Sequence, residues 1–264
     1  MPELPEVEYA ARLARRATVG KGIVGIRALH PSQRRALPDA VAATVAGDVV
    51  RDVRRRGKHQ LVQLASGRTL HVHFRMTGDW RVLAAAAPLP PYARVVLDLD
   101  DGTRLVLDDS RALSSVTLHQ AGIDPLPAMG PEATARAFST IWLGRALAAR
   151  RVPIKAALLD QRVVAGVGNI YAAEALWYAR LDPRRAANTL DAVQLAAVVA
   201  GVRSALRKAL RRPERYYGAG GASDGTTRFN VYDREGRRCR RCGATIARSV
   251  QAGRSTYWCG GCQR

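Results

Sequence analysis

The two residues after the initiator methionine are suited to covalent catalysis. Removal of Met1 leaves Pro2 at the N-terminus, where its nitrogen is a secondary amine. Such an amine can attack an aldehyde-level carbon and form an iminium, whose fixed positive charge promotes elimination at neighbouring bonds. An α-amino group titrates near pH 8, about two units below a lysine, so much of it is nucleophilic at neutral pH. Glu3 can then move protons at the same carbon.

The same residues also suit an ordinary helix start. Proline lacks the N–H that a first helical turn leaves unpaired, and carboxylates favour the positive end of the helix dipole. On local sequence alone this second interpretation is the stronger one, and the choice depends on the rest of the chain.

Four cysteines in the last 26 residues form a second group with recognisable chemistry. Their spacing is two pairs of Cys-x2-Cys separated by 16 residues, at Cys239, Cys242, Cys259 and Cys262. Paired short spacings in a chain without a secretion signal indicate metal binding rather than disulfides. Four thiolates close a tetrahedral shell, so we expect one structural Zn2+.

The charge of the chain points to a polyanionic partner. Its 264 residues carry 42 basic and 22 acidic side chains, a formal net charge of +20, and only four of the basic residues are lysines. The segment 228–264 holds nine arginines against two acidic residues. Arginine binds phosphate through a planar fork, which makes nucleic acid the first candidate. The absence of a long apolar run or a basic leader predicts a cytoplasmic protein without membrane contact.

The hydrophobic pattern predicts the elements that position these groups. Apolar residues at helical spacing follow Pro2 and predict a helix of about 15 residues, ended by Gly20 or Gly22. Short alternating runs from 23 to about 120 are typical of an antiparallel sandwich or barrel. A proline-rich connector near 123–131 precedes helical patterns at 132–149, 153–162, 170–179 and 191–212. A zinc hairpin ends the chain, so the fold class is α+β.

Four motifs, in this order, resemble the formamidopyrimidine-DNA glycosylase and endonuclease VIII family of base-excision repair enzymes. They are PELPEVE after Met1, HFRMTG at 73–78, GVGNIYAAEAL at 166–176 and the four-cysteine C-terminus. The resemblance covers nearly the whole chain. It implies an N-terminal helix with a β-sandwich over 1–125, a helix–two-turn–helix domain over 131–215 and a zinc finger over 228–264. It also favours the catalytic interpretation of Pro2 and Glu3.

The resemblance assigns further residues to catalysis and to DNA. Lys58 matches the family's catalytic-pocket lysine, and Arg254 matches the arginine that contacts the lesion phosphates. Met76 matches the side chain inserted where the damaged base leaves the stack, and Arg111 matches a contact to the orphaned base. The family's second arginine and aromatic wedge are here Ala112 and Leu113, a departure from its pattern.

The helical region contributes the remaining assignments. The N–H groups at a helix start and the Asn169 amide are expected to hold phosphate. Glu174 faces the lesion side in the family and is catalytic or structural. Basic residues before this element are expected to reach the same backbone, namely Arg150, Arg151 and Lys155. Tyr92 is also assigned to DNA contact.

These residues predict a bifunctional glycosylase and abasic-site lyase. It would excise oxidised or ring-opened bases and cut the strand by β,δ-elimination, acting as a monomer on double-stranded DNA. The family's lid loop is reduced here to a glycine-rich remnant, Tyr216 to Thr227, so 8-oxoguanine should be excised slowly unless Tyr216 and Tyr217 replace the lid. The alternative is a zinc-finger DNA-binding protein of the same fold with weak or no turnover.

Overall fold

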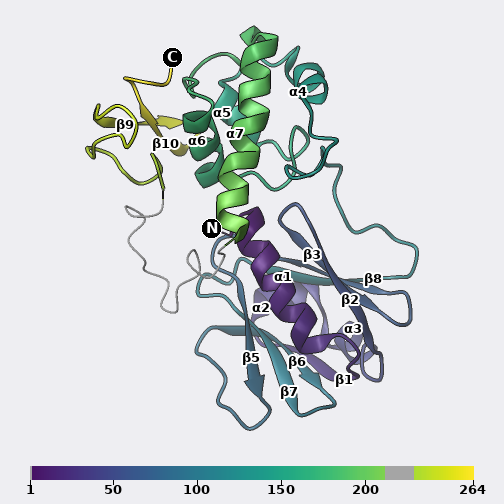
Figure 1. The fold of residues 1–264 in the computed structure, drawn as a ribbon. Helices are drawn as coiled ribbons and strands as arrows, with labels where there is room; N and C mark the ends of the chain where they lie inside the picture. Colours follow the sequence, from purple (N-terminus) through teal and green to yellow (C-terminus); the bar gives the residue numbers. More distant parts are fainter. Residues whose placement is uncertain (1, 212–228) are drawn as a thin grey trace. The chain divides into compact units, whose positions relative to one another are not determined.

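The computed structural model describes residues 2–211 and 229–264, which fall into two compact units (Figure 1). The first unit comprises Met1–Pro2 and Glu6–Pro127, and the second comprises Glu3–Pro5 and Ala128–Arg264. The glycine-rich remnant 216–227 lies outside the described residues. No described helix is both long enough and apolar enough to cross a membrane.

Helix α1, Leu4–Thr18, has the length that the sequence predicts. Its apolar positions repeat at helical spacing, so Val7, Ala10 and Ala14 share one face and are buried in the core of the first unit. The helix ends just before Gly20, whose φ of 83° is costly for residues with a side chain.

Two four-stranded antiparallel sheets make up most of the rest of the first unit, as the sandwich prediction requires (Figure 1). One sheet has the order β1-β6-β7-β5, formed by Ile23–Ala28, Ala93–Leu99, Thr103–Asp108 and Asp79–Ala84. The other has the order β2-β3-β4-β8, formed by Val50–Arg56, His59–Leu64, Thr69–His73 and Ser115–His119. Strands β3 and β4 alternate buried and half-buried residues, so each presents one face to the core. Two short helices, α2 (Pro31–Ala36) and α3 (Asp39–Ala43), follow β1.

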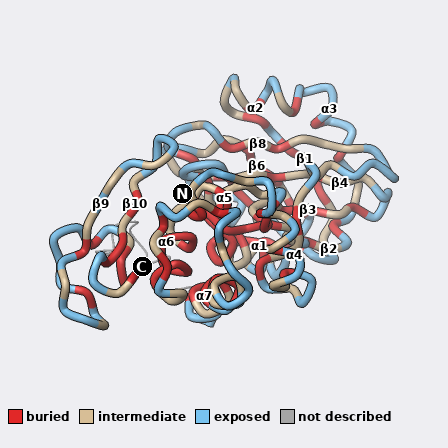
Figure 2. Tube along the Cα trace, turned by 90° about the horizontal axis from the view of Figure 1, so that it is seen from above, coloured by how far each residue is buried: buried red, intermediate tan, exposed pale blue. Residues whose placement is uncertain are grey.

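The second unit is built on helices, and its core is contributed by the four α-helices that the structure describes between residues 128 and 211. These are α4 (Thr140–Leu147), α5 (Ile154–Leu159), α6 (Asn169–Tyr178) and α7 (Ala192–Arg211), with a 3-10 turn at Ala187–Thr189. Helix α6 is buried from Tyr171 to Trp177, which Figure 2 shows in red. The sequence pattern therefore predicts three of the four helices closely.

The helix predicted over 132–149 is wrong at its N-terminal half, because α4 begins only at Thr140. The Ser139 side chain accepts the Trp142 N–H at 3.2 Å and caps this later start. Upstream, the Ala133 N–H donates to the Ala165 carbonyl at 3.2 Å. The segment before Ser139 is thus tied to a distant part of the chain instead of forming its own helical bonds.

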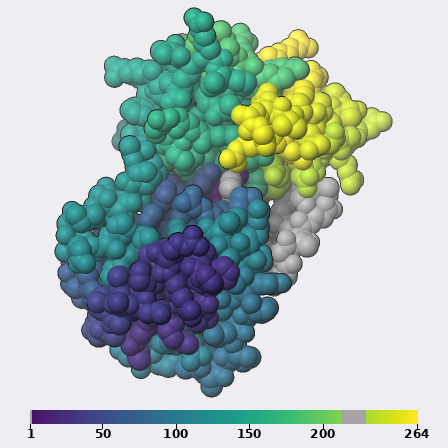
Figure 3. Space-filling model, turned by 180° about the vertical axis from the view of Figure 1, so that it is seen from behind, coloured from purple at the N-terminus to yellow at the C-terminus, as the bar shows by residue number. Residues whose placement is uncertain are grey.

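The C-terminal hairpin pairs β9, Ile246–Gln251, with β10, Arg254–Cys259. Its tip is the pair Ala252 and Gly253, both with positive φ. Residues of the hairpin and of α6 share a small apolar cluster that includes Trp177, Val231 and Ile246. Figure 3 shows the hairpin residues, in yellow, packed against helical residues in green.

Candidate active site and metal centre

The Glu3 carboxylate is bound by the N-terminus of α6. It is 1% exposed, and its oxygens accept hydrogen bonds from the backbone N–H groups of Ile170, at 2.9 Å, and Tyr171, at 3.2 Å. The first N–H groups of a helix have no partner within the helix, and the helix dipole favours an anion there. Pro2 is therefore followed directly by a fixed, buried carboxylate.

Two glycines make room for this attachment. A Cβ on Gly168 would lie 2.3 Å from Glu3 Cδ, and a Cβ on Gly166 would lie 2.4 Å from Leu4 Cδ1. Gly166 also has a φ of 96°, and its carbonyl accepts the Leu4 N–H at 3.1 Å. The Gly-Val-Gly motif thus leaves the space that the side chains of residues 3 and 4 occupy. This differs from the expectation that the helix N–H groups hold phosphate, since two of them bind Glu3.

Lys155 is 1% exposed and lies inside the second unit. Its Nζ donates to the Ser255 carbonyl at 2.8 Å and to Thr256 Oγ1 at 2.7 Å. Burial, reinforced by the charge of Arg254 and opposed by that of Glu3, lowers the pKa of Lys155 to about 8. The expectation that Lys155 reaches the DNA backbone is wrong, because its ammonium holds β10.

Asn169 joins Lys155 at the same carbonyl. Its Nδ2 donates to the Ser255 oxygen at 3.0 Å, so two side chains from different helices hold the residue that follows Arg254. Arg254 itself is exposed at the start of β10. Hydrogen bonds therefore join Lys155 and Asn169 to Ser255, and the N-terminus of α6 that carries Asn169 also binds Glu3.

Glu174 has a structural role in this molecule. Its carboxylate is 4% exposed and accepts the backbone N–H groups of Asn230, Val231 and Tyr232 at 2.8–3.1 Å, together with Asn230 Nδ2 at 2.7 Å. These bonds fix the segment that leads into the zinc hairpin. Of the two roles that the sequence leaves open for Glu174, these hydrogen bonds show the structural one.

A buried aspartate joins the two loops predicted to enter DNA. Asp109 accepts the hydroxyl of Thr77, the N–H of Arg111 at 3.2 Å and the N–H of Ser114 at 2.7 Å. Burial opposes the charge of Asp109, but the bonds from Thr77 and Ser114 outweigh it and lower the pKa. The loop after β4, which carries Met76, is thereby tied to the loop after β7.

The side chains predicted to contact DNA remain accessible around this aspartate. Met76 is 37% exposed, Tyr92 is 48% exposed and Arg111 is exposed. The Tyr92 carbonyl accepts the Asp109 N–H at 3.0 Å, which brings Tyr92 to the same loop. Leu113, at the place of the family's aromatic wedge, is 45% exposed.

Two other predicted residues lie in a β-turn and after helix α4. Lys58 is half-buried in the two-residue turn between β2 and β3. Arg150, after α4, donates Nε to the Ala146 carbonyl at 3.0 Å and pairs with Asp160 at 3.0 Å. A third of its side chain remains exposed for an external contact.

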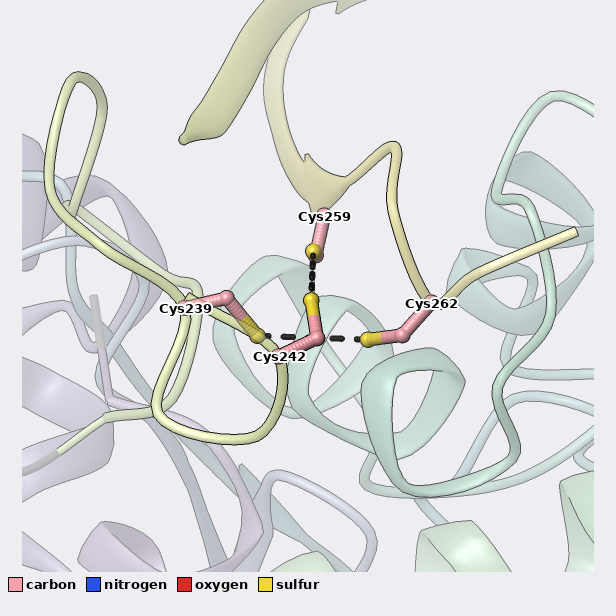
Figure 4. Close-up of side chains that lie close together, drawn as sticks. All are labelled: Cys239, Cys242, Cys259 and Cys262. Atoms are coloured by element: carbon pink, nitrogen blue, oxygen red, sulfur yellow. Dashed lines mark hydrogen bonds between the residues drawn. The ribbon is translucent and has the colours of Figure 1, made fainter. Parts of the chain in front are cut away.

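The four cysteine thiols converge on one point (Figure 4). All four Sγ atoms lie within 4.8 Å of one another, with 3.9 Å between Cys239 and Cys262 and 3.3 Å between Cys242 and Cys259. Zn–S bonds of about 2.3 Å in a tetrahedron place sulfur atoms roughly 3.8 Å apart, so the group fits zinc. Trp177 Nε1 and the Arg241 N–H both point at Cys239 Sγ and favour a thiolate. The cysteines hold one structural zinc ion.

Family models match most of the chain in three consecutive parts. The formamidopyrimidine-DNA glycosylase N-terminal domain matches residues 1–116, the H2TH domain of the same enzymes matches 129–217, and a zinc finger found in FPG and IleRS matches 236–264. A formamidopyrimidine-DNA glycosylase of Chloroflexus aggregans is 42% identical over 271 residues, covering 100% of this chain and 98% of the relative. The chain belongs to the formamidopyrimidine-DNA glycosylase family.

Other relatives agree with this assignment. A formamidopyrimidine-DNA glycosylase of Roseiflexus sp. is 41% identical over the full length of both chains. The Lactococcus lactis Fpg, solved in complex with DNA that contains an abasic site, superposes with a TM-score of 0.90 at 29% identity over 100% of both chains. The same bacterial protein, solved with DNA that contains an oxidized pyrimidine, gives a TM-score of 0.89.

The sequence alone does not identify the hydrogen-bond partners of Lys155 and Asp109 within the protein. Lys155 stands in the apolar run Ile154–Leu159, a signal of burial that the sequence does offer. Asp109 has no such signal, because its partners, Thr77 and Ser114, are brought to it only by the pairing of β5 with β7 and by the fold of its own loop.

Proposed function

We propose that this DNA repair glycosylase is bifunctional, excising oxidised or ring-opened bases and then cleaving the strand at the abasic site. The observation that carries the proposal is the pair of hydrogen bonds between the Glu3 carboxylate and the N-terminus of α6. These bonds fix the residue next to the mature N-terminus. If Glu3 served only to begin helix α1, its carboxylate would not need to be buried against α6, a helix far away in the sequence.

The reaction begins when the Pro2 nitrogen attacks C1′ of the damaged nucleotide. The bond from C1′ to the base breaks, and the base leaves with the proton of the Pro2 nitrogen. O4′ then takes a proton from Glu3 as the sugar ring opens, which gives an iminium between Pro2 and C1′. Loss of a C2′ proton expels the 3′ phosphate, and a further elimination expels the 5′ phosphate. Glu3 is the acid and base beside C1′, while Lys58 and Arg254 stabilise the phosphates and assist proton transfer.

DNA binding is divided among three proposed domains, over 1–125, 131–215 and 228–264. Met76 and Arg111 fill the space left by the extruded base, and Tyr92 supports them from the same loop region. Arg150, Asn169 and the basic zinc hairpin contact phosphate. We expect the enzyme to work as a monomer on chromosomal DNA in the cytoplasm.

Product analysis on an abasic-site duplex tests this proposal. Cleavage by β,δ-elimination leaves phosphate on both sides of a one-nucleotide gap, whereas β-elimination alone leaves an unsaturated sugar on one side. The competing DNA-binding protein without turnover would shift the duplex in a gel and leave it uncut. Uncut duplex at saturating protein would therefore contradict the proposal.

A further inference from the structure

Four of the five histidines of the chain lie on one face of the sheet β2-β3-β4-β8. They are His59 on β3, His71 and His73 on β4, and His119 on β8. All four are half-buried, whereas the residues that alternate with them on β3 and β4, such as Gln60 and Val72, are buried in the core. The stripe is therefore on the outer face, and the proposed function uses none of it.

The inner pair of this histidine stripe is in direct contact. His59 Nδ1 lies 2.8 Å from His71 Nε2, and the two rings stack with centroids 5.0 Å apart. A single proton is shared between these two nitrogens, so one ring donates and the other accepts.

The outer pair holds the inner pair in place. The ring of His73 packs edge-on against His59 at 4.6 Å, and its Nδ1 accepts the Arg75 N–H at 3.0 Å. His119 packs edge-on against His71 at 6.0 Å. Its Nε2 is fixed 2.8 Å from Thr117 Oγ1. These two edge-on contacts restrict how the inner rings can turn.

The inner histidines are uncharged at neutral pH. Burial and then the charges of His71, Arg75, Lys58 and Arg56 lower the pKa of His59 to about 4. Burial, then His119 and Arg75, lower the pKa of His71, with Asp124 acting in the opposite direction. Neutral imidazole is the form that binds a metal ion.

We propose that His59 Nδ1 and His71 Nε2 form a second metal site, for a divalent ion with right-angled coordination such as Ni2+ or Cu2+. Two metal–nitrogen bonds of 2.0–2.1 Å at a right angle place their nitrogens roughly 2.8–3.0 Å apart, and a tetrahedral ion requires about 3.3 Å. The observed 2.8 Å separation matches the right-angled arrangement.

Binding needs no net loss of a proton from the pair. The proton between the two nitrogens moves to the other nitrogen of its own ring, which frees both facing lone pairs for the ion. Among residues 2–211 and 229–264, the four cysteines are the only group of three or more histidine, cysteine or carboxylate side chains placed to hold a metal ion. The protein thus supplies two ligands here, and water completes the shell.

Calorimetric titration of the full-length, zinc-loaded protein with NiCl2 tests the proposal. We expect one equivalent of nickel to bind while the zinc content stays at one per chain. His59→Gln and His71→Gln should each weaken this binding roughly tenfold or more. His30→Gln is the matched control, since His30 lies before α2, outside the stripe, and should bind nickel as the wild type does.

Three results would contradict the proposal of a second metal site. One is the absence of any nickel binding by the wild type. Another is unchanged affinity in both stripe variants, with zinc content and melting temperature showing that they are folded. The third is release of zinc in proportion to the nickel bound, which would place nickel at the cysteines.

Discussion

The carboxylate of Glu3 accepts the backbone N–H of Ile170 at 2.9 Å, a bond between residues 167 positions apart. A second bond, from Tyr171, reaches the other carboxylate oxygen. Because Pro2 precedes Glu3 directly, the position of the proposed nucleophile depends on this bond pair. Substitutions that disturb the hydrogen bonds of Glu3 should therefore lower the rate of catalysis more than they lower the stability of the fold.

Gly168→Ala directly tests the position of the Glu3 carboxylate at the N-terminus of α6. The added Cβ would lie 2.3 Å from Glu3 Cδ and would force the carboxylate off α6. We expect abasic-site cleavage to fall about 100-fold, with a loss of about 2 kcal/mol in the free energy of unfolding. Single-turnover kinetics and urea denaturation measure the two effects.

Gly25→Ala is the matched control for that variant. Gly25 has no atom within 4 Å of an added Cβ and no positive φ, so cleavage should stay near the wild-type rate. Equal cleavage rates for the two variants would show that the hydrogen bonds between Glu3 and α6 do not position the nucleophile.

Lys155→Met removes the ammonium that holds β10 but keeps an unbranched apolar chain in the buried space. The Ser255 carbonyl keeps its bond from Asn169, while Thr256 Oγ1 loses its donor. We expect the hairpin to loosen and the dissociation constant for duplex DNA to rise roughly tenfold, the effect of about 1.4 kcal/mol.

Fluorescence anisotropy with Lys208→Met as the control checks this expectation. Lys208 is exposed on α7, so its variant loses the same charge from a solvent-exposed position of another helix. The Lys155 prediction is wrong if both variants bind DNA equally well, or if Lys155→Met loses zinc.

Asp79→Asn should stabilise the first unit at neutral pH. Burial, with the charge of the neighbouring Asp108 adding to it, raises the pKa of Asp79 from 3.8 to about 6. Between pH 4 and 6 the folded state therefore holds a proton that the unfolded state has released, and the free energy of unfolding falls as pH rises through this window. The penalty is fully present at pH 7, where we expect the neutral amide to gain about 2 kcal/mol.

Chemical denaturation at pH 4, 6 and 7 measures this gain. The advantage of Asp79→Asn should grow with pH. Asp39→Asn, which makes the same substitution at an exposed position on α3, serves as the reference. An advantage that is constant across the three pH values would rule out titration of Asp79 as its cause.

Leu113→Phe restores an aromatic side chain at an exposed position of the Arg111 loop. Aromatic stacking on the base opposite the lesion should lower the dissociation constant for lesion duplex by about fivefold, near 1 kcal/mol. Val193→Phe adds the same ring at an exposed position of α7 and should leave affinity unchanged. Equal gains in both variants would point to unspecific stacking.

The sequence predicts the local elements and motifs well and the long-range partners poorly. The 15-residue first helix, the sandwich and the zinc ligands follow from periodicity and spacing, which are local properties. The partners of Glu3 and Lys155 lie about 100 residues or more away, so no local pattern reveals them. The late start of α4 has the same cause, because Ala133 bonds to Ala165.

Peptide mapping of the covalent intermediate tests the central claim most directly. The protein is incubated with an abasic-site duplex in the presence of borohydride, which reduces the iminium to a stable amine, and is then digested and analysed by mass spectrometry. The account predicts that the sugar adduct is on the nitrogen of Pro2 in chains that lack Met1, and that chains retaining Met1 carry no adduct. An adduct on a lysine, such as Lys58 or Lys155, or on chains that retain Met1, would contradict it.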